Sequence, residues 1–233
     1  MEETIIISLG GSLVIPDLPD PDFVNTFKAI ILEEIKKGRR FVIIVGGGKV
    51  CRQYQDALSK TIKANNTDLD WIGIYTTRLN AEFVRMSFEG IAENEIVLDP
   101  SRLASFTKPI IIGAGWKPGW STDFDAVMMA EQMGAKKIIN LSNTDYVYDS
   151  DPKKNPNAKK IEEISWSEYR KLIPAEWIHS GLNTPFDPID SDRAEKNGMT
   201  VMIINGKPID NFQKALNGEK FSGTIISDNG DNN

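Results

Sequence analysis

Cysteine and histidine are each present only once in this chain of 233 residues, as Cys51 and His179. One cysteine cannot form an intramolecular disulfide, and neither a Cys-based zinc site nor a polyhistidine metal site can be built. A Ser-His-Asp triad is excluded unless His179 is its base. Any chemistry therefore depends on carboxylates, lysine, arginine, hydroxyl groups and backbone amides.

Long apolar runs are also missing, and basic residues are not in excess. The longest runs, such as residues 4–9 and 41–45, are far shorter than the ~20 residues that a membrane span needs. Nothing near the first residues resembles a signal peptide, so we expect a cytoplasmic protein without a membrane partner. With 27 Lys and Arg against 33 Asp and Glu, the net charge of -6 argues against nucleic acid as a partner.

The sequence does have the composition and length of a folded domain. Hydrophobic residues make up 40% and charged residues 26%. Apolar segments alternate with amphipathic ones, an order that predicts a three-layer α/β/α sandwich with a mainly parallel central sheet. We expect one domain with two lobes, residues 1–134 and 135–227, and a disordered tail at residues 228–233.

Hydrophobic periodicity and glycine or proline breaks place the individual elements. Strands are predicted at residues 4–9, 41–45, 95–98, 109–112, 137–141, 200–205 and 224–227, and helices at residues 23–37, 49–63, 72–92, 121–134, 165–172, 188–197 and 209–216.

Three of the predicted strands end in glycine-rich turns, which begin at Gly10, Gly46 and Gly113. In a parallel sheet these turns lie at one edge, where backbone amides and helix N-termini can bind phosphate. One such turn is weak evidence, but three at one edge favour a site for more than one phosphate group. No Walker motif is present, and no Gly-x-Gly-x-x-Gly follows the first strand.

Five longer motifs occur in the order SLGGS, VGGGKVCR, DWIGIYTTRLNA, PGWSTD and SNTDYVYDSDPK, and Gly223-Thr224 follows near the end. With them the chain resembles the amino acid kinase family and, within it, the uridylate (UMP) kinases of the archaeal-type branch. The resemblance extends from Ile5 to Ile226. It implies an ATP-dependent, Mg²⁺-requiring kinase that converts UMP to UDP in pyrimidine nucleotide biosynthesis, and a homo-oligomer, a hexamer.

The resemblance also implies roles for individual residues. The first lobe would bind the phosphate acceptor and the second the donor nucleotide. The loop that holds the donor's β and γ phosphates is matched by Gly10, Gly11 and Ser12. The loop that holds the acceptor phosphate is matched by Gly46, Gly47, Gly48 and Arg52. Asp70 matches a ligand of the acceptor ribose, and Thr122 matches a hydroxyl near the acceptor phosphate. Asp123 and Asp187 match catalytic carboxylates, and Ser142, Asn143, Asp145, Tyr148, Asp151, Pro152 and Lys153 match the segment around the donor's adenosine.

General chemistry is consistent with these roles. The acceptor oxygen of a nucleoside monophosphate is already ionised at neutral pH, so no general base is needed. Positioning and charge neutralisation carry the reaction. Each residue also has a structural alternative: Asp123 complements the dipole of its helix, Arg52 is a solvated helix residue, and Asp151-Pro152 is a turn.

Several positions depart from the family pattern. Ser8 and Asp192 stand where many members have lysine, Tyr146 replaces a glycine, and Trp116 and Trp120 replace threonine and histidine. Two alternatives to a UMP kinase therefore stay open. One is a kinase of another small phosphorylated or carboxylated metabolite, and the other is a non-catalytic protein that binds a nucleotide or oxyanion.

Overall fold

A seven-stranded sheet forms the centre of the computed structural model, which describes residues 3–103, 105–152, 154–173 and 185–228. The strand order is β3-β2-β1-β4-β8-β9-β7, and only the β8–β9 pair is antiparallel. The strands are β1 Thr4–Leu9, β2 Arg40–Val45, β3 Ile110–Gly113, β4 Lys137–Ser142, β7 Glu163–Ile164, β8 Thr200–Asn205 and β9 Gly223–Ile226; β5 Val147–Tyr148 and β6 Lys160–Ile161 form a separate antiparallel pair.

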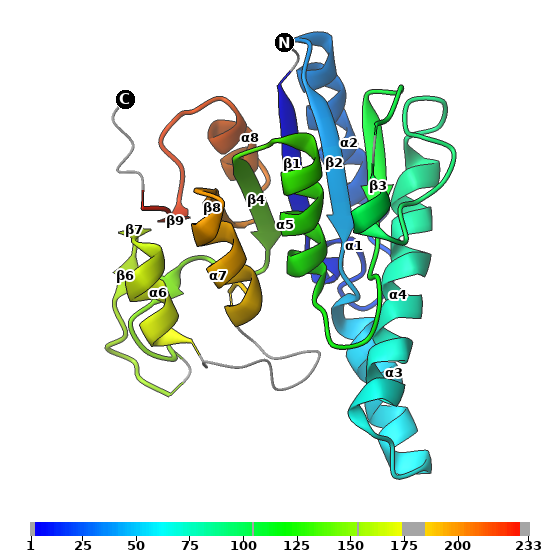
Figure 1. Cartoon of the computed structure of the whole chain (residues 1–233), viewed down its shortest axis with the longest axis vertical. Coiled ribbons are helices and arrows are strands. Elements are labelled where there is room, and N and C mark those ends of the chain that lie inside the picture. The colour runs from blue at the N-terminus through cyan, green and yellow to red at the C-terminus, as the bar shows by residue number, and fades with distance from the viewer. Residues whose placement is uncertain (1–2, 104, 153, 174–184, 229–233) are drawn as a thin grey trace.

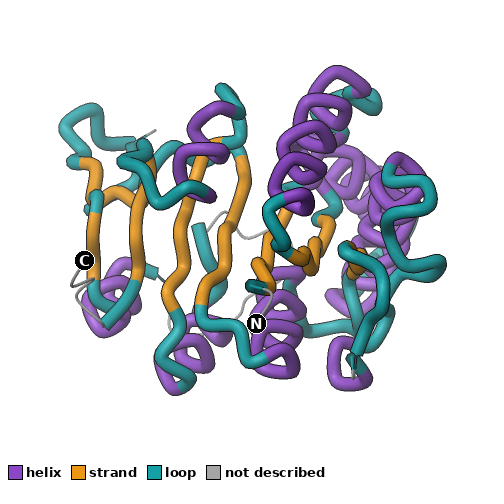
Figure 2. Tube along the Cα trace, turned by 90° about the horizontal axis from the view of Figure 1, so that it is seen from above, coloured by secondary structure: helices purple, strands orange, loops and turns teal. Residues whose placement is uncertain are grey.

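Helices cover both faces of this sheet (Figures 1 and 2). Along β1, Ile5, Ile7 and Leu9 pack on one face, and Ile6 packs on the other, because successive side chains of a strand alternate. The first face is covered by α1 Gly11–Val14, α2 Pro21–Lys36, α4 Asn66–Ser87 and α8 Asp210–Leu216, and the second by α5 Thr122–Met133, α6 Trp166–Leu172 and α7 Pro188–Lys196. The predicted α/β/α sandwich is confirmed.

The remaining helix, α3 Gly48–Thr61, packs against α4 and buries no residue of its own (Figure 1). The helix expected at residues 72–92 begins earlier, because Asn65 and Asp68 form a reciprocal capping box at its start. Within the described residues, no helix is long and apolar enough to cross a membrane.

One sequence prediction about local structure is wrong. Residues 95–98 do not form a strand; that region touches β3 only through single bridges at Ala92 and Val97, and a 3-10 turn at Pro100–Arg102 follows. At the start of the expected tail, the carboxylate of Asp228 accepts a hydrogen bond from Trp166 N at 3.0 Å. Residues 229–233 lie outside the described part of the chain.

Candidate active site

The turns after β1 and β2 meet at the carboxyl edge of the sheet, as the glycine pattern predicts. A Cβ atom on Gly11 would lie 2.5 Å from Gly48 N, and one on Gly48 would lie 2.8 Å from Ser12 N. Real Cβ atoms do not come this close to backbone, and Gly48 also has φ +68°. The glycines therefore allow two strand ends to touch, and the N-termini of α1 and α3 come together there.

Asn80 of α4 fixes the second turn, a role that the sequence analysis missed. Its Nδ2 donates to the carbonyl oxygens of Gly46 and Gly47 at 2.9 and 3.1 Å, and its side chain is fully buried. Because Asn80 holds both carbonyl groups, the backbone conformation of the turn is fixed. The available signal was an amide side chain one helical turn after Thr77, on the helix face that also carries Ile74, Ala81 and Val84.

The first cavity, about 180 Å³, opens between this turn, α3, α4 and the start of α5. It brings together five predicted acceptor residues, Gly47, Gly48, Arg52, Asp70 and Thr122. Arg52 Nη2 lies 3.4 Å from Ser12 Oγ, so its guanidinium connects the two glycine turns. Cys51 also lines the cavity, and burial raises the pKa of its thiol to about 11, which argues against a nucleophile.

Asp70 has one oxygen in use and one available. Its Oδ2 accepts a hydrogen bond from Gly119 N at 2.8 Å, while the buried Oδ1 has no partner among the described residues. A buried carboxylate oxygen without a donor is costly unless a ligand supplies one. The geometry therefore suits the ribose hydroxyl that the sequence resemblance implied.

The loop after β3 forms the remaining wall of the first cavity. Arg78 Nη2 donates to Trp116 O at 3.1 Å, and Thr77 Oγ1 accepts from Gly115 N at 2.9 Å, so α4 holds this loop in place. Trp120 lines the cavity and stacks on Phe124, with 4.0 Å between the ring centroids. Of the two tryptophans noted in the sequence, Trp120 therefore forms part of the wall of the first cavity.

Asp123, at the start of α5, is a half-buried carboxylate that two strands contact. Its Oδ1 accepts hydrogen bonds from Ser8 Oγ of β1 at 2.8 Å and from Asn140 Nδ2 of β4 at 3.0 Å. Burial raises its pKa to about 7; the Ser8 hydrogen bond opposes this shift, and the charge of Asp187 adds to it. A solvated helix-start residue would not have these partners.

Three fully buried carboxylates surround Asp123. Asp187, the N-cap of α7, accepts from Ile189 N at 2.8 Å, and burial raises its pKa to about 6. Asp190 accepts from Ser121 Oγ at 2.8 Å, and burial together with Asp187 raises its pKa well above the usual value. Burial also raises the pKa of Asp125 to about 8. This concentration of desolvated acid is typical of a functional site.

A second cavity, about 690 Å³, lies on the other side of the β1 turn. Five predicted donor residues line it, Asn143, Asp145, Tyr148, Asp151 and Pro152. Ser142 connects it to the glycine turns at the carboxyl edge of the sheet, since a Cβ on Gly10 would lie 3.2 Å from Ser142 Cα. Tyr146 adds an aromatic wall, with Lys160 Nζ 4.7 Å from its ring centroid. Lys153 and His179 lie outside the described residues.

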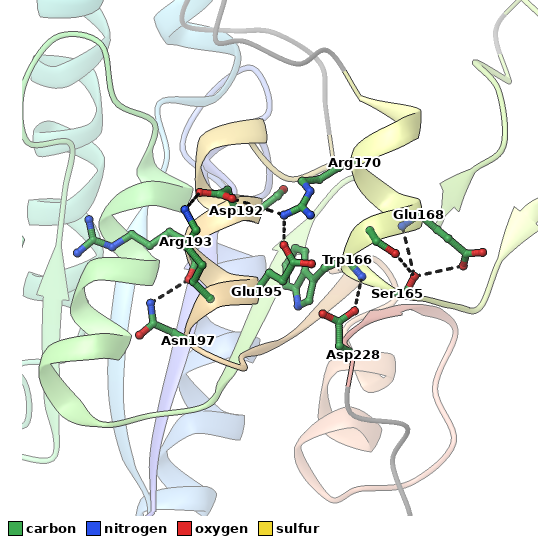
Figure 3. A network of polar contacts seen from close by, with 12 residues as sticks. Ser165, Trp166, Glu168, Arg170, Asp192, Arg193, Glu195, Asn197 and Asp228 are labelled. Carbon is green, nitrogen blue, oxygen red and sulfur yellow. Dashed lines mark hydrogen bonds and ion pairs between the residues drawn. The ribbon is translucent and has the colours of Figure 1, made fainter.

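Asp192, which stands where many family members have lysine, takes part in a network of ion pairs between α6 and α7 (Figure 3). It lies 3.6 Å from Arg170 Nη1 and 2.6 Å from Lys196 Nζ. The neighbouring Arg193 binds both carboxylate oxygens of Glu131. Asp192 is an anion and Arg193 is bound to Glu131, so this position does not supply the cation that a lysine would.

Comparison with known proteins places this fold and site in a family. A model of the amino acid kinase family matches residues 3–205, and the chain belongs to that family. Its curated relatives include the uridylate kinases of Pyrococcus abyssi, 33% identical over 95% of this chain and 98% of that protein, and of Thermoplasma acidophilum, 34% identical over 98% of each.

Solved structures agree with this membership. The uridylate kinase of Archaeoglobus fulgidus matches with a TM-score of 0.78 and 28% identity, over 97% of this chain and 100% of that one. The UMP kinase of Bacillus anthracis matches with a TM-score of 0.75 at 19% identity, over 97% of this chain and 96% of that one, a likeness of fold. The family expected from the sequence motifs is confirmed.

Proposed function

We propose that this protein is a uridylate kinase, which transfers the γ-phosphoryl group of ATP to UMP and forms ADP and UDP for pyrimidine nucleotide biosynthesis. One observation carries the proposal: two cavities lie on either side of touching glycine turns, and the predicted acceptor residues line one while the predicted donor residues line the other. The names of the archaeal relatives support the same reaction.

In this proposal residues 1–134 form the acceptor lobe and residues 135–227 the donor lobe. Arg52 and the amides of Gly47 and Gly48 bind the UMP phosphate, with Thr122 beside it, and Asp70 binds the ribose. Gly10, Gly11 and Ser12 bind the β and γ phosphates of ATP, whose adenosine occupies the second cavity. Backbone amides at helix N-termini suit both sets of phosphates.

Asp123 and Asp187 act at the point of transfer. Mg²⁺, when bound with ATP, would neutralise phosphate charge between donor and acceptor. The described residues contain no group of three Asp, Glu, His or Cys arranged to hold a metal ion. One or two carboxylates with phosphate oxygens are sufficient for Mg²⁺ in kinases, and Asp123 and Asp187, close enough for their charges to interact, fit that role.

A homo-oligomer, a hexamer built on dimers, is the proposed assembly. Its support is a row of exposed apolar side chains along α4, at Trp71, Tyr75, Leu79 and Met86; Tyr75 is 63% and Leu79 70% exposed. Exposed apolar rows of this kind favour contact with another protein surface. A monomeric mass by light scattering at micromolar concentration would rule out the assembly without affecting the proposed reaction.

The decisive experiment is an ADP-release assay with MgATP and a panel of nucleoside monophosphates and small phosphorylated or carboxylated metabolites. Turnover with UMP above all others is expected. Trp120 lines the proposed acceptor cavity, where it can change which acceptor fits. Turnover with an acceptor other than UMP would instead favour a kinase of another small phosphorylated or carboxylated metabolite. Tight ATP binding without any turnover would indicate a non-catalytic binder.

A further inference from the structure

The edge where the glycine turns meet needs more positive charge, once nucleotides bind, than the residues described so far supply. Asp125, Asp187 and Asp190 are buried there, and Asp123 is half-buried beside them. ATP and a monophosphate would add several more negative charges, and phosphoryl transfer requires cations around them. Arg78 binds loop carbonyls and Arg193 binds Glu131, so these two cations are committed elsewhere.

Two lysines approach this edge from opposite sides of β1. Lys49 follows Gly48, whose backbone touches Gly11 and Ser12. Lys207 follows Gly206, whose N–H donates to Ser142 O at 2.8 Å. Lys207 also lies close to the donor cavity, because its N–H donates to Asn205 Oδ1 at 2.9 Å and Asn205 Nδ2 donates to Asp145 at 2.6 Å. Lys49 lies one helical turn before Arg52, on the acceptor side.

Both ammonium groups are bound by one short segment, residues 15–20, which joins α1 to α2. Lys49 Nζ pairs with Asp17, and Lys207 Nζ lies 3.0 Å from Asp20 Oδ2. The Lys49 and Lys207 side chains are 49% and 53% exposed. Ion pairs with this exposure contribute little to stability, so an ammonium group leaves such a pair readily when a more highly charged partner arrives.

We propose that Lys49 and Lys207 are nucleotide-phosphate ligands that exchange Asp17 and Asp20 for phosphate oxygens. Lys207 contacts the ATP phosphates, and Lys49 contacts the phosphate of the acceptor. The assignment of the two nucleotides rests on the proposed function. Asp17 and Asp20 hold both lysine side chains next to the β1 turn. When a nucleotide binds, each ammonium group therefore replaces a carboxylate partner with a phosphate partner and does not have to be ordered first.

The test is direct binding of each nucleotide alone, by calorimetry, to Lys49→Ala, Lys207→Ala and the wild type. Lys207→Ala is expected to weaken MgATP binding about tenfold and to leave UMP binding within about twofold, whereas Lys49→Ala is expected to do the reverse. Lys60→Ala serves as the matched control, because Lys60 pairs with Asp56 within α3, and both affinities are expected to stay unchanged. Lys→Arg at each site is expected to restore most of the lost affinity.

Asp20→Asn separates exchange from a purely structural ion pair. Asp20 caps α2 through Phe23 N at 2.9 Å, and asparagine caps equally well, so the fold is retained. If Lys207 exchanges Asp20 for phosphate, MgATP should bind Asp20→Asn more tightly than it binds the wild type, because Lys207 no longer has a competing carboxylate. Unchanged MgATP affinity in both Lys207→Ala and Asp20→Asn would overturn the proposal for the donor side, and unchanged UMP affinity in Lys49→Ala would overturn it for the acceptor side.

Failure of the proposed function gives a different result. A wild-type protein that binds MgATP but neither binds nor phosphorylates UMP would refute the UMP kinase assignment. The effects of Lys207→Ala and Asp20→Asn on MgATP affinity would still decide the donor half of the proposal.

Discussion

The edge where the glycine turns meet and the two cavities beside it are built by different means. At the edge, backbone touches backbone: Gly11 and Gly48 leave no room for a side chain, Gly10 leaves little, and Asn80 donates hydrogen bonds to the turn after β2. In the cavities, side chains such as Trp120, Asp70 and Tyr146 form the walls. The glycines of the first region match the family pattern, whereas Ser8 beside them and Trp120 and Tyr146 in the cavities depart from it. Substitution is therefore constrained most where backbone contact defines the site.

The largest effect is expected for Gly11→Ala. The new Cβ would lie 2.5 Å from Gly48 N, so the β1 and β2 turns would have to separate. We expect a loss of about 1–3 kcal/mol in the free energy of unfolding and no measurable phosphotransfer. Urea denaturation and ADP release check both. A variant as stable and active as the wild type would show that the turns do not need to touch.

Asp123→Asn tests the half-buried carboxylate at the same edge. The amide keeps the size of the side chain and a hydrogen-bond acceptor for Ser8, but removes the charge used at the transition state. We expect kcat to fall by about 10² or more, with a smaller change in KM. Steady-state kinetics at saturating ATP and Mg²⁺ give the answer. A kcat within twofold of wild type would remove Asp123 from the reaction.

Arg52→Ala, on the wall of the acceptor cavity, is expected to fail differently. Arg52 would hold the UMP phosphate in both ground and transition states, so its loss should raise KM for UMP about tenfold and change kcat less. The KM for ATP provides the internal control. An equal rise in both KM values would indicate a general disturbance of the glycine turns.

The buried carboxylates also predict a pH dependence of stability in the nucleotide-free protein. The folded-state pKa of Asp125 is about 8, above the unfolded value, so the folded protein holds a proton that the unfolded chain releases. The contribution of this bound proton to the free energy of unfolding is complete at low pH and is lost as the pH rises through the folded-state pKa of about 8. Between pH 6 and 8.5 the wild type should lose at least about 1 kcal/mol more than Asp125→Asn in urea unfolding. Parallel pH profiles would show that Asp125 is already ionised at pH 6.

The smallest effect is expected for Gly73→Ala, a glycine of the cavity wall. It lies inside α4, and a Cβ there would meet only the Cys51 and Gln55 side chains, both at an ordinary 3.5 Å. Alanine should stabilise the helix by up to about 1 kcal/mol and leave the KM for UMP within about twofold. Thermal unfolding and kinetics measure both. Damage comparable to that of Gly11→Ala would remove the distinction between the two regions.

The sequence predicts most of the sheet and the positions of the glycine turns, because continuous β-branched runs such as residues 4–9 leave no alternative element. It does not reveal β5 and β6, since two-residue strands carry no periodic pattern. The bonds of Asn80 to the Gly46 turn and of Ser8 to Asp123 connect distant segments, so their partners emerge only when the chain is folded. Candidate ligand-binding residues are thus easier to predict from the sequence than the residues that hold them in place.

The position of β9 has a consequence for how the chain folds during synthesis. β9 lies between β8 and β7 in the sheet, although it is the last strand to be made. The β3-β2-β1 half uses only residues up to Gly113 and can pair while the ribosome is still adding the rest. The other half cannot close until Ile226 has emerged. A nascent chain therefore passes through a stage in which β8 and β7 have unpaired edges, and this interval is the time at which chaperones or edge-to-edge aggregation would act on it.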